Sequence, residues 1–376
     1  MKAIFEKPKH HLILLIILIL IYNQTFSQIS NYLTPIYEAQ SDNFTKSVYI
    51  ENDRLTCEIN KTIVSKFDLE NKPFSFLTGI DNKSFSLIKY SFRSKSEKSN
   101  FELFLLDENF AISFYRKFDF NYEEQIPKVL VINSSQFLLY YPSNGSLKLI
   151  TKNRDVEIEL FKNDTVEYFQ ERIGHLIPYR DKVLITLSQL KKDGRLISKV
   201  FLLNIETLET QSFEVDIQVI YKIFQLRSDI FLTGIKTEPE LSTAFYALEI
   251  NQEDFGKSKL IKIADEFIEA NVKNSSNLFF GRNYLYELKN GSLIKTDFRV
   301  NDEIILDALS TTKSFVLITR KDLTTNFYKL DKSFRLLEKE TIEKYLSNPE
   351  LKLGIDKNLY LIDKNRTILV KNFSEE

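Results

Sequence analysis

Histidine is the scarcest catalytic side chain in this sequence, and its position limits the chemistry. The chain has three His residues, and His10 and His11 lie in an N-terminal leader, which leaves His175. A zinc site takes about four N or S ligands, and Cys57 is the only Cys. A Ser-His-Asp triad would have to use His175, but no Gly-x-Ser-x-Gly elbow accompanies it. Zinc held by His and Cys, and triad hydrolysis, are therefore both disfavoured.

The segment around this histidine, residues 171–181, collects several rare residue types. One interpretation turns Arg172, His175, Tyr179 and Arg180 toward a ligand at the centre of the fold. The other is a buried strand with a hydrogen-bonded His and an ordinary salt bridge. Both stay open, and the four residues are candidates for ligand binding.

A second candidate is the aromatic pair Tyr140 and Tyr141, which precedes Pro142. We expect this pair to be the most exposed aromatic cluster, suited to a carbohydrate or peptide. A strand that alternates faces would bury one of the two rings.

Carboxylates are the remaining source of catalysis. An Asp/Glu pair could hydrolyse a polysaccharide, but such pairs are defined by their separation in space, which a sequence does not give. Phosphate-binding glycine loops and the EF-hand loop are absent. No cofactor is indicated; Ca²⁺ held by Asp and backbone carbonyls in an axial channel is conceivable, without support from a motif.

The first residues predict export. Lys2, Lys7 and Lys9 precede the apolar run 12–21, which is shorter than the ~20 residues of a membrane span. A basic start, a short apolar run and small residues after it are typical of a signal peptide. We expect residues 1–27 to be removed, with an uncleaved anchor as the alternative, and no membrane span in the mature chain. The mature protein would be periplasmic or extracellular.

The charge of the chain disfavours nucleic acid as a partner. The formal net charge is −1, whereas nucleic-acid binders usually present a basic face.

A short strand motif recurs along the chain: an aromatic residue, any residue, then Leu or Ile, usually followed by a polar turn-former. The intervals between copies average close to the ~40–50 residues of a four-stranded propeller blade. The motif predicts about seven such blades, with six or eight as alternatives. The copies begin at Phe104, Phe201, Tyr246, Tyr286, Tyr328 and Tyr360, with degenerate copies at Ser65 and Tyr140.

Two hydrophobic patterns support a sheet with covered inner strands and a half-exposed outer strand. Continuous apolar runs indicate strands buried on both faces: 183–187, 230–232, 278–280 and 315–318. Alternating runs indicate one wet face: 156–160 and 213–219.

Turns and weak helical signals complete this pattern. The pairs Asp193-Gly194 and Asn290-Gly291 favour tight hairpin turns. The sequence Asn-Gly-Ser-Leu occurs at both 144–147 and 290–293, each time after an aromatic strand. Residues 265–272 and 338–346 are predicted as short helices.

Together these features resemble the exported bacterial β-propellers, whose strands read aromatic-x-aliphatic-Asp. The closest match is Tyr360-Leu361-Ile362-Asp363. The chain has no Trp, which excludes the Trp-Asp repeat class, and it lacks the paired glycines of kelch repeats. The resemblance implies residues 28–47 as a lead-in or ring-closing segment and residues 48–376 as the propeller domain. A pair of β-sandwiches is the structural alternative.

Without a catalytic motif, the sequence favours a binding module over an enzyme. The expected ligand is a protein, peptide or glycan on one face of the ring. The alternative is a carboxylate-based extracellular hydrolase or lyase acting on polysaccharide. A structural part of a surface assembly is a third possibility.

Overall fold

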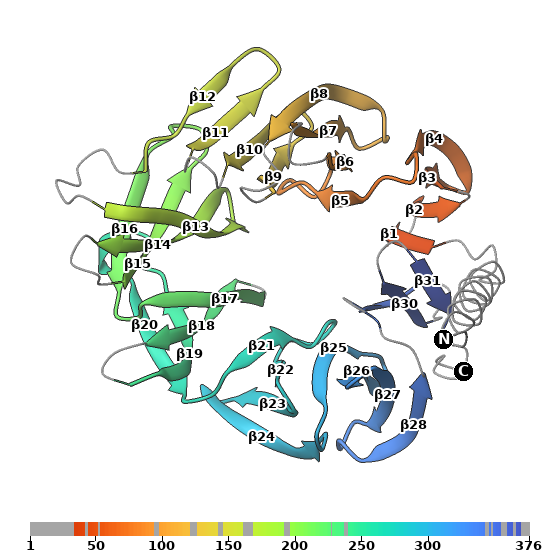
Figure 1. The fold of residues 1–376 in the computed structure, drawn as a ribbon, viewed down its shortest axis with the longest axis vertical. Helices are drawn as coiled ribbons and strands as arrows, with labels where there is room; N and C mark the ends of the chain where they lie inside the picture. Colours follow the sequence, from red (N-terminus) through yellow and green to blue (C-terminus); the bar gives the residue numbers. More distant parts are fainter. Residues whose placement is uncertain are drawn as a thin grey trace, which may run out of the picture.

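The protein is a ring of small antiparallel sheets. In the computed structural model, eight sheets surround a common centre, and β1, β5, β9, β21 and β25 lie on its inner side (Figure 1). Seven sheets have four strands and the last has three, which confirms the predicted all-β propeller of about seven four-stranded blades. The structure describes residues 34–369 except 42–43, 52, 94–97, 121–125, 142–145, 161–167, 192–195, 227, 237–239, 343–345, 347–348, 355–358 and 364–365.

Each sheet is formed by strands that are consecutive in the chain, and we number the sheets 1 to 8 in chain order. The first four sheets are made of β1 (Thr34–Ser41), β2 (Phe44–Glu51), β3 (Arg54–Ile59) and β4 (Thr62–Asp68); β5 (Phe74–Thr78), β6 (Phe85–Ser91), β7 (Ser99–Leu106) and β8 (Ile112–Phe120); β9 (Lys128–Asn133), β10 (Gln136–Tyr141), β11 (Ser146–Thr151) and β12 (Asp155–Glu157); β13 (Tyr168–Tyr179), β14 (Lys182–Lys191), β15 (Leu196–Asn204) and β16 (Thr210–Val215).

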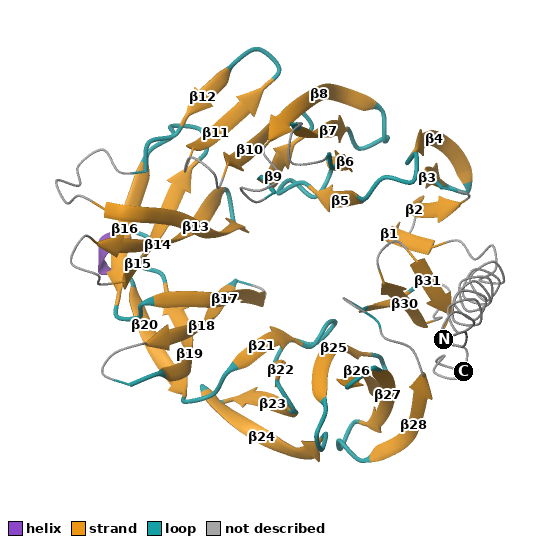
Figure 2. Ribbon diagram, viewed as in Figure 1, coloured by secondary structure: helices purple, strands orange, loops and turns teal. Residues whose placement is uncertain are grey.

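The last four sheets follow the same plan, and the described residues include one short 3-10 helix, η2 (Phe255–Lys257), in sheet 5 (Figure 2). Their strands are β17 (Val219–Leu226), β18 (Asp229–Lys236), β19 (Ser242–Glu249) and β20 (Lys259–Ala264); β21 (Ile268–Asn271), β22 (Leu278–Gly281), β23 (Tyr284–Lys289) and β24 (Ser292–Arg299); β25 (Ile304–Ser310), β26 (Ser314–Lys321), β27 (Thr324–Asp331) and β28 (Leu336–Ile342); β29 (Glu350–Leu353), β30 (Leu359–Asp363) and β31 (Arg366–Leu369).

The second strands carry the continuous apolar runs, as predicted. The four runs fall in β14, β18, β22 and β26, whose apolar side chains there are buried. These strands have a neighbouring strand on each side and a neighbouring sheet over each face, so an all-apolar sequence suits them.

The aromatic motif marks the third strand in five sheets: β7, β15, β19, β23 and β27. The remaining copies lie on other strands, and the clean copy at Tyr360 lies on β30, the second strand of sheet 8. Tyr140 lies on β10, a second strand, and residues 65–68 lie on β4, a fourth strand. An aromatic side chain packs equally well from a second or a third strand, both of which are covered. The copy at Ser65 is the exception, because β4 is an end strand without buried residues.

The two predicted helices are wrong, because both segments pair as strands. Residues 265–272 contain β21, and residues 338–346 overlap β28, which pairs with β27. Pairing with a neighbouring strand outweighs a weak helical preference in such short segments. The alternating run 213–219 is also divided, since β16 ends at Val215 and β17 begins at Val219.

The described turn of the Asn-Gly type has the expected geometry. Asn290 and Gly291 have φ angles of 51° and 75°, and positive φ at both central residues is what a type I′ turn requires. The pairs at 193–194 and 144–145 lie outside the described residues, as does the leader 1–27. The predicted boundary between residues 47 and 48 falls inside β2, and β1 pairs with β2 in sheet 1.

Seven hydrophobic clusters hold the ring together, one between each pair of consecutive sheets from sheets 1 and 2 to sheets 7 and 8. Between sheets 5 and 6, for example, the rings of Phe245 and Phe279 lie 5.0 Å apart. Among the described residues, no cluster joins sheet 8 to sheet 1; an attraction between Lys352 on β29 and Glu38 on β1 acts across that seam. No helix among the residues described here has the length and apolar character needed to cross a bilayer.

Candidate functional site

The first strands of several sheets share a β-bulge at one register. The shift occurs in β13 at Gly174, in β17 at Tyr221 and in β25 at Leu306, and β1 and β21 have it too. A bulge leaves one residue unpaired and re-aims the chain beside it. The residues directly after the bulge in β13, β17 and β25 are His175, Lys222 and Asp307, so these three positions are equivalent.

In sheet 4 the bulge carbonyl bonds to the preceding sheet. Lys128, on β9 of sheet 3, donates its Nζ hydrogen to the carbonyl of Gly174. A Cβ atom on Gly174 would lie 2.9 Å from the Oγ1 of Thr186, so glycine fits this close approach. Burial lowers the pKa of Lys128, and its charge is therefore held in a partly desolvated setting.

His175 forms the next link around the ring. Its Nδ1 lies 2.9 Å from the Oγ1 of Thr186, and its ring makes a hydrogen bond with the backbone of Tyr221 in sheet 5. Burial, with the charges of Lys128 and Lys222 as further causes, lowers the pKa of His175 to about 4. The imidazole is therefore neutral at pH 7 and joins sheets 4 and 5.

Tyr221 and Lys222 present the accessible part of this region. The Tyr221 side chain is 42% exposed, and its ring centroid lies 4.8 Å from that of Phe267. The Nζ of Lys222 lies 5.6 Å from the Tyr221 centroid. Among the described side chains, no carboxylate is within ion-pair distance of Lys222 (≤ 4.0 Å). We call Lys128, His175, Tyr221 and Lys222 the basic patch.

At the equivalent position in sheets 6 to 8, oppositely charged side chains are paired with one another. The Nζ of Lys273 lies 2.8 Å from Asp307 and 2.9 Å from Glu350, and Asp307 also accepts the backbone N–H of Leu351 at 2.6 Å. Burial raises the pKa of Asp307, and Lys273 opposes this effect. Lys273, which follows β21, is thereby joined to Asp307 on β25 and Glu350 on β29. The formal charges of these three side chains sum to −1, so the lysine is fully compensated.

The structure does not bring the candidates from residues 171–181 into one site. Tyr179 is buried between sheets 4 and 5, and exposed Arg180, at the β13–β14 turn, lies 5.5 Å over its ring. His175 lies four residues earlier on the same strand, a distance of roughly 13 Å along an extended chain. The backbone of Arg172 is in β13, and its side chain is outside the described set.

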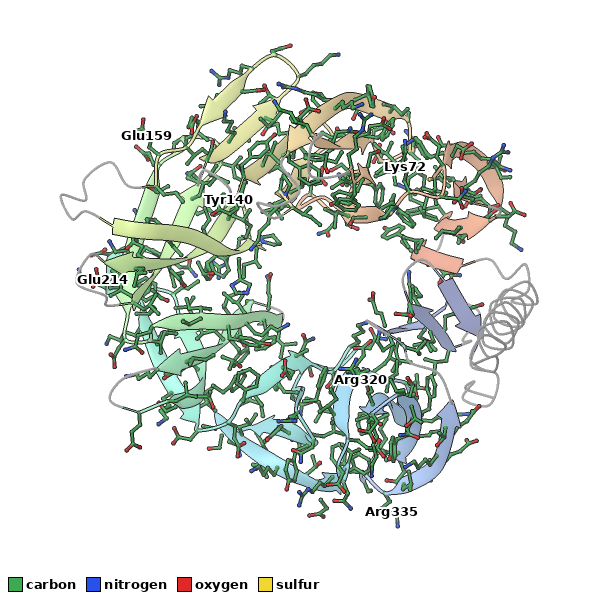
Figure 3. All side chains as sticks on the ribbon, viewed as in Figure 1. Lys72, Tyr140, Glu159, Glu214, Arg320 and Arg335 are labelled. Atoms are coloured by element: carbon green, nitrogen blue, oxygen red, sulfur yellow. The ribbon has the colours of Figure 1, made fainter. Side chains whose placement is uncertain are left out.

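The expected exposure of Tyr140 is wrong. Its side chain is 1% exposed and belongs to the cluster between sheets 3 and 4, where Figure 3 labels it. Tyr141 points to the opposite face and is half-buried against the cluster between sheets 2 and 3. The alternation of a strand buries one ring, as anticipated, and neighbouring sheets cover most of the other.

The sequence interpretation missed Lys128, Tyr221 and Lys222. A usable signal was present: 47 residues separate Lys128 from His175, and 47 separate His175 from Lys222. In a repeat protein, such spacing places side chains at equivalent points of successive units. Within the part of the chain that is described, no group of three or more His, Cys, Asp or Glu residues is arranged to hold a metal ion.

Comparison with known proteins finds similar folds only. No protein family profile matches the chain, and no curated protein matches it. The β-propeller domain of the Trilobed protease from Pyrococcus furiosus is 12% identical, with a TM-score of 0.44 over 79% of this chain and 95% of that chain. An acylaminoacyl peptidase from Pyrococcus horikoshii is 10% identical, with a TM-score of 0.45 over 77% and 50%. Hsv2 of Kluyveromyces lactis is also 10% identical, with a TM-score of 0.44 over 79% and 91%. At this level of similarity, function has to be argued from the chain's own residues.

Proposed function

We propose that this chain is an exported β-propeller that binds a protein or peptide partner through acidic groups of that partner at the basic patch. The observation that carries the proposal is the convergence of Lys128, His175 and Lys222 from three successive sheets, next to the exposed ring of Tyr221. Hydrogen bonds from an ammonium group to a carboxylate are about twice as strong as neutral ones.

Desolvation favours such a ligand. Lys128 is partly buried, and its pKa is lowered for that reason. A carboxylate bound next to it would stabilise the charged form, and the attraction is stronger in this setting than in open water. His175 holds the junction as a neutral ring at pH 7, so the positive charge of the basic patch comes from Lys128 and Lys222.

The aromatic pair suits a peptide. Tyr221 and Phe267 form a tilted pair with a centroid distance of 4.8 Å, and Tyr is among the residues enriched at the centres of protein interfaces. An apolar side chain next to the acidic residue of a partner would cover the Tyr221 ring.

Export is the second part of the proposal and rests on the leader, residues 1–27. Mass spectrometry of the protein recovered from a bacterial periplasm should give a chain that begins at Gln28. A full-length chain in the cell membrane would contradict this part alone.

The binding proposal can be tested with a fluorescein-labelled peptide that carries four Glu residues around one Tyr. Fluorescence anisotropy should show saturable binding, weakened about tenfold in Lys222→Gln, which corresponds to about 1.4 kcal/mol. The matched control is Lys289→Gln, which removes an exposed lysine at the end of β23.

Two further ligands identify what is recognised. The same peptide with Gln in place of Glu should bind at least tenfold more weakly, because the ammonium–carboxylate hydrogen bonds are lost. Trigalacturonate tests whether the carboxylate of a glycan is preferred. Equal binding of the Glu and Gln peptides, or equal losses in Lys222→Gln and Lys289→Gln, would contradict the proposal.

A further inference from the structure

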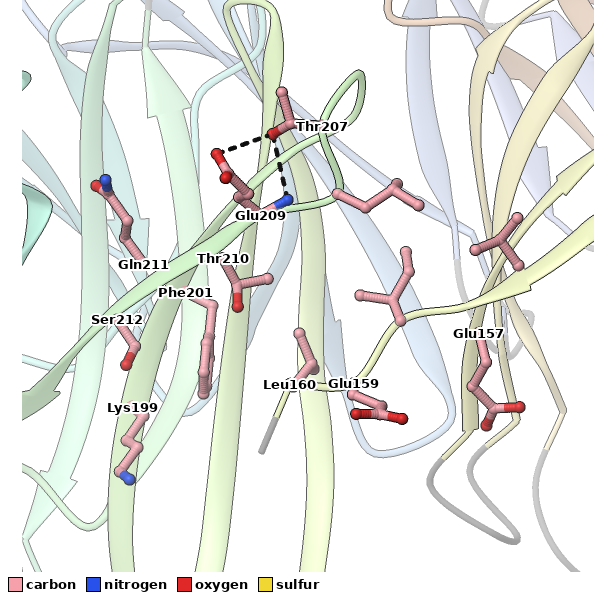
Figure 4. A pocket seen from close by; sticks show the side chains of 13 residues that line it. Glu157, Glu159, Leu160, Lys199, Phe201, Thr207, Glu209, Thr210, Gln211 and Ser212 are labelled. Carbon is pink, nitrogen blue, oxygen red and sulfur yellow. Dashed lines mark hydrogen bonds between the residues drawn. The ribbon is translucent and has the colours of Figure 1, made fainter. Parts of the chain in front are cut away.

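A cleft opens between sheets 3 and 4, away from the basic patch. Its volume is about 880 Å³, within the usual range for ligand sites. Buried Ile158, Leu160 and Phe201 give it an apolar floor, and Figure 4 shows Phe201 and Leu160 between Ser212 on one side and Glu159 on the other.

The cleft coincides with the shortest outer strand. β12 has three residues, whereas the other fourth strands have six to nine. Residues 158–160, just after β12, line the cleft in place of a longer paired strand. Ile158 and Leu160 point into the core while Glu157 and Glu159 are exposed, so this segment keeps the alternation of a strand.

Across the cleft, β16 is the end strand of sheet 4. Its consecutive residues Thr210, Gln211 and Ser212 all line the cleft. Because neighbouring residues of a strand point to opposite faces, we infer that the cleft reaches around the edge of β16. An end strand presents unpaired N–H and C=O groups to an extended chain.

The charge around the cleft is negative. Three carboxylates, Glu157, Glu159 and Glu209, and one ammonium group, Lys199, line it. Lys199 lies 3.8 Å from Glu214, and the described contact of the Glu209 carboxylate is the hydroxyl of Thr207 at 3.2 Å.

We propose that this cleft binds an extended segment of a partner protein that places an apolar side chain against Phe201 and a Lys or Arg next to Glu209. The apolar floor supplies the burial, the β16 edge supplies backbone hydrogen bonds, and the rim selects a basic residue. This second site would bind ligands of the opposite charge to those of the basic patch, so the experiments can contradict one proposal and leave the other in place.

The test is an array of hexapeptides probed with the labelled mature protein. Each peptide carries one Leu, Ile, Val or Phe, flanked by Lys or Arg in one set and by Asp or Glu in the other. We expect the basic set to be retained by the cleft and the acidic set to depend on Lys222 instead. Absence of retention of the basic set, or a basic set whose retention depends on Lys222, would overturn the inference.

Two variants locate the retention. Ser212→Trp places an indole over Phe201, the cross-strand partner of Ser212, and should abolish binding of the basic set. Glu209→Gln should weaken that binding by about fivefold, the upper range for an exposed ion pair. Glu206→Gln, an exposed position in the same loop that does not line the cleft, is the matched control. Retention that is unchanged in both Ser212→Trp and Glu209→Gln would overturn the assignment to this cleft.

Discussion

The two halves of the ring use equivalent positions in different ways. After the bulge, sheets 4 and 5 place His175 and Lys222, whereas sheet 7 places Asp307. Lys128 and His175 join their sheets by hydrogen bonds to backbone groups of the next sheet, and Lys222 adds a further cation there. Asp307 joins its sheets through Lys273 and Leu351 and neutralises the lysine. A position needed for assembly can therefore also carry charge for a ligand, provided that the same junction does not cancel it.

The largest expected effect on stability is at the junction of sheets 6 to 8, where Asp307 is paired with Lys273. Asp307→Ala removes the acceptor for Lys273, Leu351 and Ala308 at once. Lys273 is 33% exposed and keeps Glu350, so the cost comes mainly from the N–H groups of Leu351 and Ala308, at about 1–3 kcal/mol for each buried donor left without an acceptor. Urea denaturation should show the sum of these losses. Asp307→Asn keeps one acceptor oxygen and should cost less. A loss below about 1 kcal/mol in Asp307→Ala would show that the junction is not an important link.

The stability of the protein should depend on pH through His175, in the half of the ring that contains the basic patch. The pKa of His175 is about 4 in the folded protein and about 6.5 in an unfolded chain. Above pH 6.5 both states hold a neutral imidazole, so stability does not depend on it. Below pH 6.5 the imidazole is protonated in the unfolded chain and stays neutral in the folded chain. The free energy of unfolding therefore decreases as the pH falls toward 4, by about 3 kcal/mol in total.

Urea denaturation at pH 7, 6, 5 and 4 measures this loss. His175→Gln lacks the titrating group and should lose less stability over the same range. Parallel curves for the wild type and His175→Gln would mean that the imidazole does not distinguish the two states.

A smaller effect on stability should distinguish the two contacts by which a threonine of a second strand links neighbouring sheets. Thr186 bonds to His175, which continues to Tyr221, whereas the equivalent Thr233 bonds directly to the carbonyl of Ile268 at 2.7 Å. Thr186→Val and Thr233→Val each remove one buried hydrogen bond, worth about 0.5–1.5 kcal/mol. The Thr186→Val variant should additionally change the pH dependence of stability, and Thr233→Val should not. Equal pH profiles would show that Thr186 does not act through His175.

The smallest effect is on the titration of His175 itself. The charge of Lys222 helps to lower this pKa, so Lys222→Gln should raise it. NMR titration of the imidazole signals measures the change, with His175→Gln to assign the signal. Lys289→Gln should leave the titration unchanged, and an equal rise in that control would mean that the effect is not local.

The sequence predicted the second strands, which a sheet covers on each face, better than the first strands, which lie nearest the centre of the ring. Runs such as Phe315–Ile318 are apolar because two sheets cover them, and the chain shows this without further information. The bulges at Gly174 and Tyr221 were not predicted, because a bulge depends on the partner strand and has no fixed composition. His175 was singled out for its rarity, whereas its two charged neighbours, Lys128 and Lys222, are near it only because sheets 3, 4 and 5 pack side by side.

The candidate site was predicted only in part for the same reason. Tyr179 and Arg180 are near His175 in sequence, yet the extended strand separates them from it, whereas Lys128 and Lys222 are distant in sequence and adjacent in space. Proximity along a strand was the wrong guide, and the 47-residue spacing was the right one.

Among the described residues, the seam between the last sheet and the first differs from the other junctions of the ring. β1 pairs only within sheet 1, and β29 to β31 form sheet 8 alone, so in the described residues no strand ladder and no hydrophobic cluster spans this junction. Every other junction would have to shed a buried apolar layer to part. Separating any of these seven junctions would therefore expose side chains that the neighbouring sheet now covers.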